Sequence, residues 1–210
     1  MPIINYARRE VQFKIVYYGP ALGGKTTNLA YIHSRIPEPH RGDLVSLATA
    51  ADRTLFFDFM PVTAAVLQGF RTKFQLYTVP GQVIYNATRQ LVLRNVDGVV
   101  FVADSQWEKV EENVDSLRNL AENLEKQNLV LDDLPHVLQL NKRDLPDAAP
   151  FSYLEYILNH RKRRVPSFAA VASTGRNVFA ALDAVTQLLL HRFNQDHQWQ
   201  DQGRRADRAP

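Results

Sequence analysis

The sequence contains no cysteine among its 210 residues. This absence excludes disulfides, thiolate metal sites, cysteine nucleophiles, prenylation and palmitoylation. Residue 2 is proline rather than glycine, so an N-myristoyl group is not expected either, and we predict no lipid anchor. No stretch reaches the roughly 18 apolar residues of a membrane-spanning helix, and the first residues lack the apolar core of a signal peptide. We therefore expect a cytoplasmic protein.

Strong charge of one sign is also missing. The formal net charge is +3 and the sequence pI is about 9.2, a bias too small to indicate nucleic-acid binding. The six histidines are scattered without the spacing of metal ligands, so no zinc site is expected. The densest basic run spans 160–164, and the sequence leaves two interpretations of it: a solvated loop, or a contact with a membrane or an acidic partner.

Apolar strands alternate with amphipathic helices along the chain, which predicts an α/β fold with right-handed βαβ units. The predicted strands cover 11–18, 44–49, 53–62, 70–79, 96–105, the start of 136–144, and 167–173. The predicted helices cover 26–36, 108–127, 152–160 and 176–193. We expect one doubly wound, mostly parallel sheet with helices on both faces and one antiparallel edge hairpin. Residues 1–193 would form this domain, and the polar tail 194–210 is expected to be disordered.

A phosphate-binding loop follows the first long strand. Gly19-x-x-x-x-Gly24-Lys25-Thr26 matches the Walker A pattern, with a strand before it and a helix after it. Backbone N–H groups of such a loop point at phosphates, the lysine reaches the terminal phosphates, and the Thr26 hydroxyl is a magnesium ligand. The predicted phosphate-binding residues are Gly19, Gly23, Gly24, Lys25, Thr26 and Thr27.

The base is indicated by a second motif, Asn141-Lys142-Arg143-Asp144, at the end of a predicted strand. A carboxylate at Asp144 accepts two hydrogen bonds from guanine, whereas adenine offers no such pair of donors. We expect Asn141 to connect the loops and the Lys142 stem to cover the base. Ala172 and Ser173 end the last strand, where a backbone N–H would contact the guanine oxygen. The alternative function, an ATP-using P-loop kinase, is disfavoured by Asp144.

These motifs resemble those of the Ras-like small GTPases, and more closely those of their bacterial gliding-motility branch, the MglA-type polarity GTPases. The resemblance lies in KIVYYGP (14–20), GKTTNL (24–29), DRTLFFDF (52–59), LYTVPGQ (76–82), VDGVVFVADS (96–105) and NKRDLPDA (141–148). It implies a GTP/GDP switch with Mg²⁺ that controls cell polarity and motility through state-dependent effectors. It also implies a roadblock-fold activating partner of the MglB type and recruitment to a cell pole.

The resemblance further implies roles for four residues. Gln82 would orient the attacking water, and the Gly81 N–H would contact the γ-phosphate. Thr54 would close on Mg²⁺ and the γ-phosphate, and Arg53 would act as an arginine finger in cis. Lys25 and the loop amides would stabilise the transferred charge. A solvated loop arginine is the alternative for Arg53.

Thr78 stands where most Ras-like proteins have an aspartate that supports the metal, a substitution shared by the gliding-type branch. Asp58 is the candidate replacement, as an outer-shell group beside the metal ligands Thr26 and Thr54. The alternative is that Asp58 faces solvent on an edge strand.

Ala21 occupies a loop position where these proteins usually have glycine. Its methyl group would leave GTP binding intact and slow hydrolysis, unless the loop has adjusted around it with the help of Gly23. The sequence therefore leaves two functions open. One is a GTPase that is slow without its activating partner, and the other is a largely GTP-locked adaptor with negligible hydrolysis.

Overall fold

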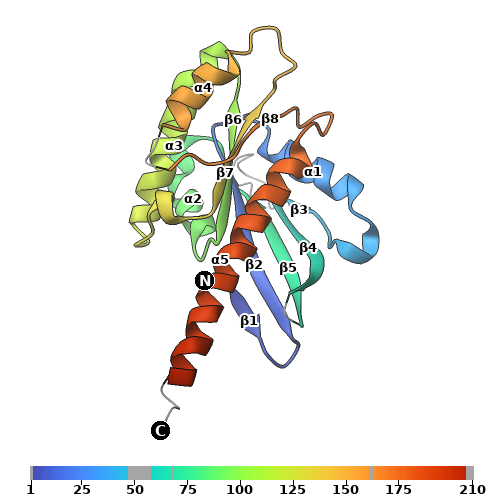
Figure 1. The fold of residues 1–210 in the computed structure, drawn as a ribbon. Helices are drawn as coiled ribbons and strands as arrows, with labels where there is room; N and C mark the ends of the chain where they lie inside the picture. Colours follow the sequence, from blue (N-terminus) through green and yellow to red (C-terminus); the bar gives the residue numbers. More distant parts are fainter. Residues whose placement is uncertain (1, 47–57, 68, 161–162, 207–210) are drawn as a thin grey trace.

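Parallel strands form the centre of the sheet in the computed structural model, which describes residues 2–46, 58–67, 69–160 and 163–206 (Figure 1). The strand order is β3-β4-β5-β2-β6-β7-β8, and β1 pairs with β2. The strands are β1 (Ile3–Asn5), β2 (Glu10–Tyr18), β3 (Val45–Ser46), β4 (Asp58–Leu67), β5 (Phe70–Thr78), β6 (Gly98–Asp104), β7 (His136–Asn141) and β8 (Ser167–Ala169). Since β5, β2, β6, β7 and β8 are parallel, their carboxyl ends meet at one edge of the sheet.

The predicted antiparallel hairpin is confirmed. β4 pairs antiparallel with β5, and the short β3 pairs antiparallel with β4. The end of β4 differs from the prediction, because the strand continues to Leu67 rather than ending at residue 62. Residues 47–57, on which parts of two predicted strands fall, lie outside the described residues.

Helices cover both faces of the sheet, as expected. α1 and α5 pack on one face, and α2, α3 and α4 pack on the other (Figure 1). The helices are α1 (Lys25–Arg35), α2 (Asn86–Leu93), α3 (Val110–Glu125), α4 (Phe151–Leu158) and α5 (Val178–Ala206). Short 3₁₀ turns occur at Glu38–His40, Val83–Tyr85, Trp107–Lys109 and Leu131–Asp133.

The two faces of the sheet have separate apolar cores. Alternate side chains of β2 point into one core or the other, so this strand contributes to both. Phe13, Ile15 and Tyr17 belong to the core under α1 and α5. Val16 and Tyr18 belong to the core under α2, α3 and α4. Successive side chains of a strand point to opposite faces, so a central strand buried on both sides must be apolar throughout.

Three features differ from the prediction. α2 and β1 were not predicted, and in α2 the apolar residues 91–93 are consecutive, so they give no helical spacing. α5 continues past residue 193 to Ala206, into the tail that we expected to lack regular structure. In Figure 1 this last part of α5 extends beyond the sheet.

Candidate functional site

The phosphate-binding loop lies between the end of β2 and the start of α1. Its glycines are required by close contacts as well as by backbone conformation. Gly24 has φ +100°, and a Cβ there would lie 2.2 Å from Nδ2 of Asn141. At Gly19, with φ +147°, a Cβ would lie 2.1 Å from the Val102 carbonyl oxygen. Side chains other than hydrogen would therefore push the loop away from the ends of β6 and β7.

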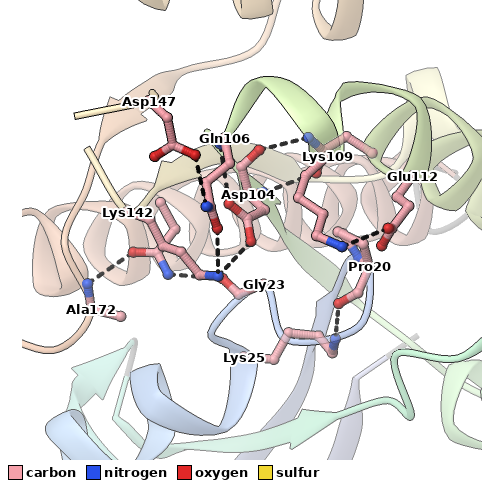
Figure 2. A network of polar contacts seen from close by, with 12 residues as sticks. Pro20, Gly23, Lys25, Asp104, Gln106, Lys109, Glu112, Lys142, Asp147 and Ala172 are labelled. Carbon is pink, nitrogen blue, oxygen red and sulfur yellow. Dashed lines mark hydrogen bonds and ion pairs between the residues drawn. The ribbon is translucent and has the colours of Figure 1, made fainter. Parts of the chain in front are cut away.

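Lys25 begins α1 and is buried. Its Nζ donates hydrogen bonds to the carbonyl oxygens of Pro20, at 2.6 Å, and Gly19, at 3.1 Å. Figure 2 shows the ammonium group turned toward Pro20 beneath the loop. The loop therefore surrounds a fixed positive charge, which attracts an anion to the start of the helix.

Two adjoining cavities lie at the carboxyl edge of the sheet, where open α/β sheets bind ligands. The first, of about 350 Å³, is lined by Ala21, Leu22, Gly24, Lys25, Thr26, Thr27, Thr78, Val79, Pro80, Gly81, Gln82 and Tyr85. The second, of about 230 Å³, is lined by Leu22, Gly24, Thr27, Asn141, Lys142, Asp144, Leu145, Val171, Ala172 and Ser173. Because three residues line both, the cavities form one elongated site with two ends.

Asn141 connects three segments at the second cavity, which we call the base end. Its Nδ2 donates to the Gly23 carbonyl oxygen at 2.8 Å. Its Oδ1 accepts a hydrogen bond from the Ala172 N–H, also at 2.8 Å. The buried amide thus joins the phosphate-binding loop to the segments that follow β7 and β8, which is the connecting role predicted from the sequence.

Lys142 lies beside Asn141 with φ +62° and forms an ion pair with Asp104, at 2.5 Å between Nζ and Oδ2. The Asp104 side chain is 0% exposed, and the contact is an ion pair rather than an aligned hydrogen bond. Gln106 lies next to this pair, and Figure 2 shows its side chain between Lys142 and Asp147. The ion pair holds the Lys142 stem along the wall of the base end.

Asp104 was not predicted as a site residue. Its signal in the sequence is its position, because it is the polar residue that ends the otherwise apolar strand β6 at the carboxyl edge. Asp144, which was predicted, is exposed at the rim of the base end. The carboxylate of Asp144 has no hydrogen-bond or ion-pair partner in the described part of the chain.

At the first cavity, which we call the phosphate end, the phosphate-binding loop lies against the turn that follows β5. Thr26 and Thr78 line it from α1 and the end of β5, and Gln82 lines it from the following turn. A Cβ at Gly81 would lie 2.3 Å from the Ala21 Cα, so the turn lies directly on the phosphate-binding loop. The residue that departs from the family pattern, Ala21, therefore shares this end with Gln82.

Three predicted residues remain without a described side chain. Arg53 and Thr54 fall outside the described residues. Asp58 begins β4, whose neighbour β5 ends at Thr78, and its side chain is not among those that the structure describes.

No helix in the described ranges combines the length and apolar character needed to cross a membrane. A search of protein-family models found no match. The chain is 54% identical over 190 residues to the Mutual gliding-motility protein MglA of Myxococcus xanthus (strain DK1622), covering 90% of this chain and 96% of that protein.

Proposed function

The chain belongs to the MglA family of small GTPases, and from this premise we propose that it is a GTP-binding switch that hydrolyses GTP and controls cell polarity and motility. The observation that supports this proposal best is the elongated site, whose phosphate end contains Lys25 and whose base end has Asp144 at its rim. A nucleotide has this layout, with charged phosphates at one end and a planar base at the other.

At the base end, Asp144 accepts two hydrogen bonds from guanine, and the Lys142 stem covers the base. Ala172 and Ser173 lie at the same end, where the Ser173 N–H contacts the guanine oxygen, because the Ala172 N–H already donates to Asn141. Since the carboxylate has no partner among the described residues, binding adenine would leave it without a hydrogen bond.

At the phosphate end, loop N–H groups of Gly19, Gly23 and Gly24 and the Lys25 ammonium hold the phosphates, together with Thr26 and Thr27. The cavity offers hydroxyl oxygens from Thr26 and Thr78, which are the hard donors that Mg²⁺ prefers. We propose Thr26 and Thr54 as ligands and Asp58 as an outer-shell group. When bound, the cation neutralises charge on the phosphates.

Hydrolysis requires a water in line with the γ-phosphorus. Gln82 orients this water. The water oxygen bonds to the γ-phosphorus while its proton passes to a phosphate oxygen, and the bond from phosphorus to the bridging oxygen breaks to leave GDP and inorganic phosphate. Lys25 and Arg53 stabilise the charge that moves onto the bridging oxygen. A roadblock-fold partner of the MglB type would align Arg53 with Gln82, and motility effectors would read the GTP form at a cell pole.

A second function is favoured by the contact between Gly81 and Ala21. The extra methyl group beside Gln82 would hinder placement of the water, so the protein would remain bound to GTP as an adaptor. The nucleotide in freshly purified protein separates the two functions. Bound GDP with measurable single-turnover hydrolysis supports the GTPase, and retained GTP without turnover supports the adaptor.

Asp144→Asn tests the guanine assignment. We expect GTP and GDP affinities to fall about 100-fold and xanthosine triphosphate binding to be gained, because the amide matches the altered base. Asp147→Asn is the matched control, since Asp147 lies in the same loop but accepts its hydrogen bond from Gln106, outside the cavity. Retained ATP, or unchanged GTP affinity in Asp144→Asn, would refute the assignment.

A further inference from the structure

Arg89, in α2, is the largest side chain that is completely buried in the described part of the protein, with 0% exposure. It lies behind the turn that contains Gly81 and Gln82, and it does not line the phosphate end of the site. Arginine is seldom buried without a paired carboxylate, because removal of its charge from water is costly. The buried charge of Arg89 must therefore be compensated by other groups.

Arg89 uses its guanidinium to hold two consecutive carbonyl groups. Nε donates to the Pro80 oxygen at 2.9 Å, and Nη2 donates to the Gly81 oxygen. Nη1 donates to Oδ1 of Asn119 at 2.7 Å. The ring of Tyr18 lies 5.2 Å from the guanidinium carbon, within the range of a cation–π contact. None of these partners is a carboxylate, so dipoles and a ring compensate the charge.

The two carbonyl bonds also fix the direction of two N–H groups. In a trans peptide the C=O and the following N–H point to opposite sides, and no cis peptide occurs in the described residues. Holding the Pro80 oxygen therefore directs the Gly81 N–H away from Arg89. Holding the Gly81 oxygen directs the Gln82 N–H in the same way. Neither N–H has a hydrogen-bond partner among the described residues.

The same network reaches the root of the phosphate-binding loop. Tyr18 directly precedes Gly19, and its hydroxyl donates to Oδ1 of Asn119 at 2.7 Å. Asn123 donates to the Tyr18 oxygen at 3.2 Å and to Oδ1 of Asn86, the first residue of α2, at 2.7 Å. Burial raises the pKa of Tyr18, so the phenol remains protonated and keeps its hydrogen bond to Asn119. The turn, α2, α3 and the loop are thus connected through side chains with little freedom.

We propose that Arg89 is a positioning residue for GTP hydrolysis, which holds residues 80–82 so that the N–H groups of Gly81 and Gln82 face the terminal phosphate. This inference rests on the proposed function. GDP lacks the third phosphate that these two N–H groups would bind, so the arrangement discriminates GTP from GDP. The same hydrogen bonds fix the position of the backbone that carries the Gln82 side chain, and so the direction in which that side chain approaches the attacking water.

Arg89→Lys is the principal test, because lysine keeps the charge but cannot present a planar fork to two carbonyls and Asn119 together. Affinities for GDP and for a non-hydrolysable GTP analogue are measured beside single-turnover hydrolysis. We expect GDP affinity within about threefold of the unaltered protein, analogue affinity lowered about tenfold, and hydrolysis slowed about 100-fold. Arg118→Lys is the matched control, since Arg118 is exposed on α3 and pairs only with Asp115 among the described residues.

Asn119→Ala provides a second test that leaves Arg89 in place, should Arg89→Lys fail to fold. It removes the acceptor shared by Arg89 and Tyr18, and we expect hydrolysis to slow about fivefold with GDP affinity unchanged. Backbone amide exchange provides a direct readout. The Gly81 and Gln82 amides of the unaltered protein should become protected with the GTP analogue but not with GDP, and Asn119→Ala should reduce that protection.

Two results would overturn the inference. One is a folded variant with the same preference for analogue over GDP and the same hydrolysis rate. The other is an equal loss of GDP and analogue binding that follows the fall in melting temperature, which is what a purely structural arginine would give. Failure of the unaltered protein to bind any guanine nucleotide would instead defeat the proposed function, and the inference with it.

Discussion

The base end and the phosphate end of the site are held in different ways. At the base end, the lining residues Asn141 and Lys142 themselves make the contacts that hold the walls, to Gly23, Ala172 and Asp104. At the phosphate end, residues 80–82 are held from behind by Arg89. The walls of the base end are therefore joined to one another, and the Asp144 carboxylate at its rim lacks a partner in the described part of the chain, whereas the phosphate end presents backbone N–H groups that lack an acceptor among the described residues.

Under the proposed function, this difference would allow one site to bind both GTP and GDP and still distinguish them. The base and the first two phosphates are common to GTP and GDP, so residues at the base end contribute equally to both. Under the proposed function, only the third phosphate of a bound GTP would reach the turn at residues 80–82. Substitutions at the base end should thus change both affinities together, and those in the turn at residues 80–82 should change the triphosphate state alone.

Gly24→Ala should damage both ends of the site at once, because Gly24 lines both cavities. The new Cβ would displace Asn141 and adopt a strained backbone, so we expect GTP and GDP affinities to fall about 1000-fold. Equilibrium titration with fluorescent nucleotides measures both. Gly69→Ala is the control, since Gly69 has φ +82° with nothing within 4 Å of a Cβ, and affinity should not change there.

Gln82→Ala should show the phosphate end acting alone. Loss of the group that orients the water is expected to slow single-turnover hydrolysis about 100-fold, with GDP affinity unchanged. Gln195→Ala, at an exposed glutamine of α5, should hydrolyse GTP at the normal rate. Equal rates for the two variants would remove Gln82 from the mechanism.

Asn141→Ala should show the base end acting alone. It removes two hydrogen bonds between loops, so we expect GDP and GTP affinities to fall together by about 30-fold. Asn159→Ala is matched closely, because Asn159 is buried and joins the two ends of another loop through the Val165 N–H and C=O. That variant should lose similar stability in thermal unfolding and retain its affinity. A loss confined to GTP in Asn141→Ala would contradict the division of the site.

Ala21→Gly should have the smallest effect. Removal of one methyl group beside Gly81 is expected to speed hydrolysis about threefold without altering GDP affinity, and Ala21→Val should slow it. Single-turnover rates across the three side chains would give the trend. A rate that is independent of side-chain size would mean that the loop has adjusted to Ala21.

Sequence reasoning predicted the parts of the molecule that depend on local pattern. The sheet of mostly parallel strands, the antiparallel hairpin and four of the helices follow from alternation, apolar runs and helical spacing. The connecting position of Asn141 was also predicted, because the ends of parallel strands meet at one edge. The proposed contacts with nucleotide and metal remain predictions, including those of Arg53 and Thr54.

What escaped prediction depends on tertiary contacts. α2 has consecutive apolar residues and is joined to α3 and the turn by Arg89, whose partners lie at Pro80, Gly81 and Asn119. No local feature of the sequence distinguishes this arginine from a solvated one. The ion pair of Lys142 with Asp104 joins residues 38 positions apart, and only the parallel pairing of β6 with β7 brings them together.

The chemical groups of the Arg89 network determine how the network responds to pH. Its hydrogen-bond acceptors are two carbonyl groups and a neutral amide, and the raised pKa of Tyr18 keeps the phenol neutral. Among the described residues, the network contains no carboxylate and no histidine, the side chains that ordinarily change charge between about pH 4 and 7. The segment that faces the third phosphate would thus keep its position across this range. Any pH dependence of hydrolysis in this range would arise outside the network.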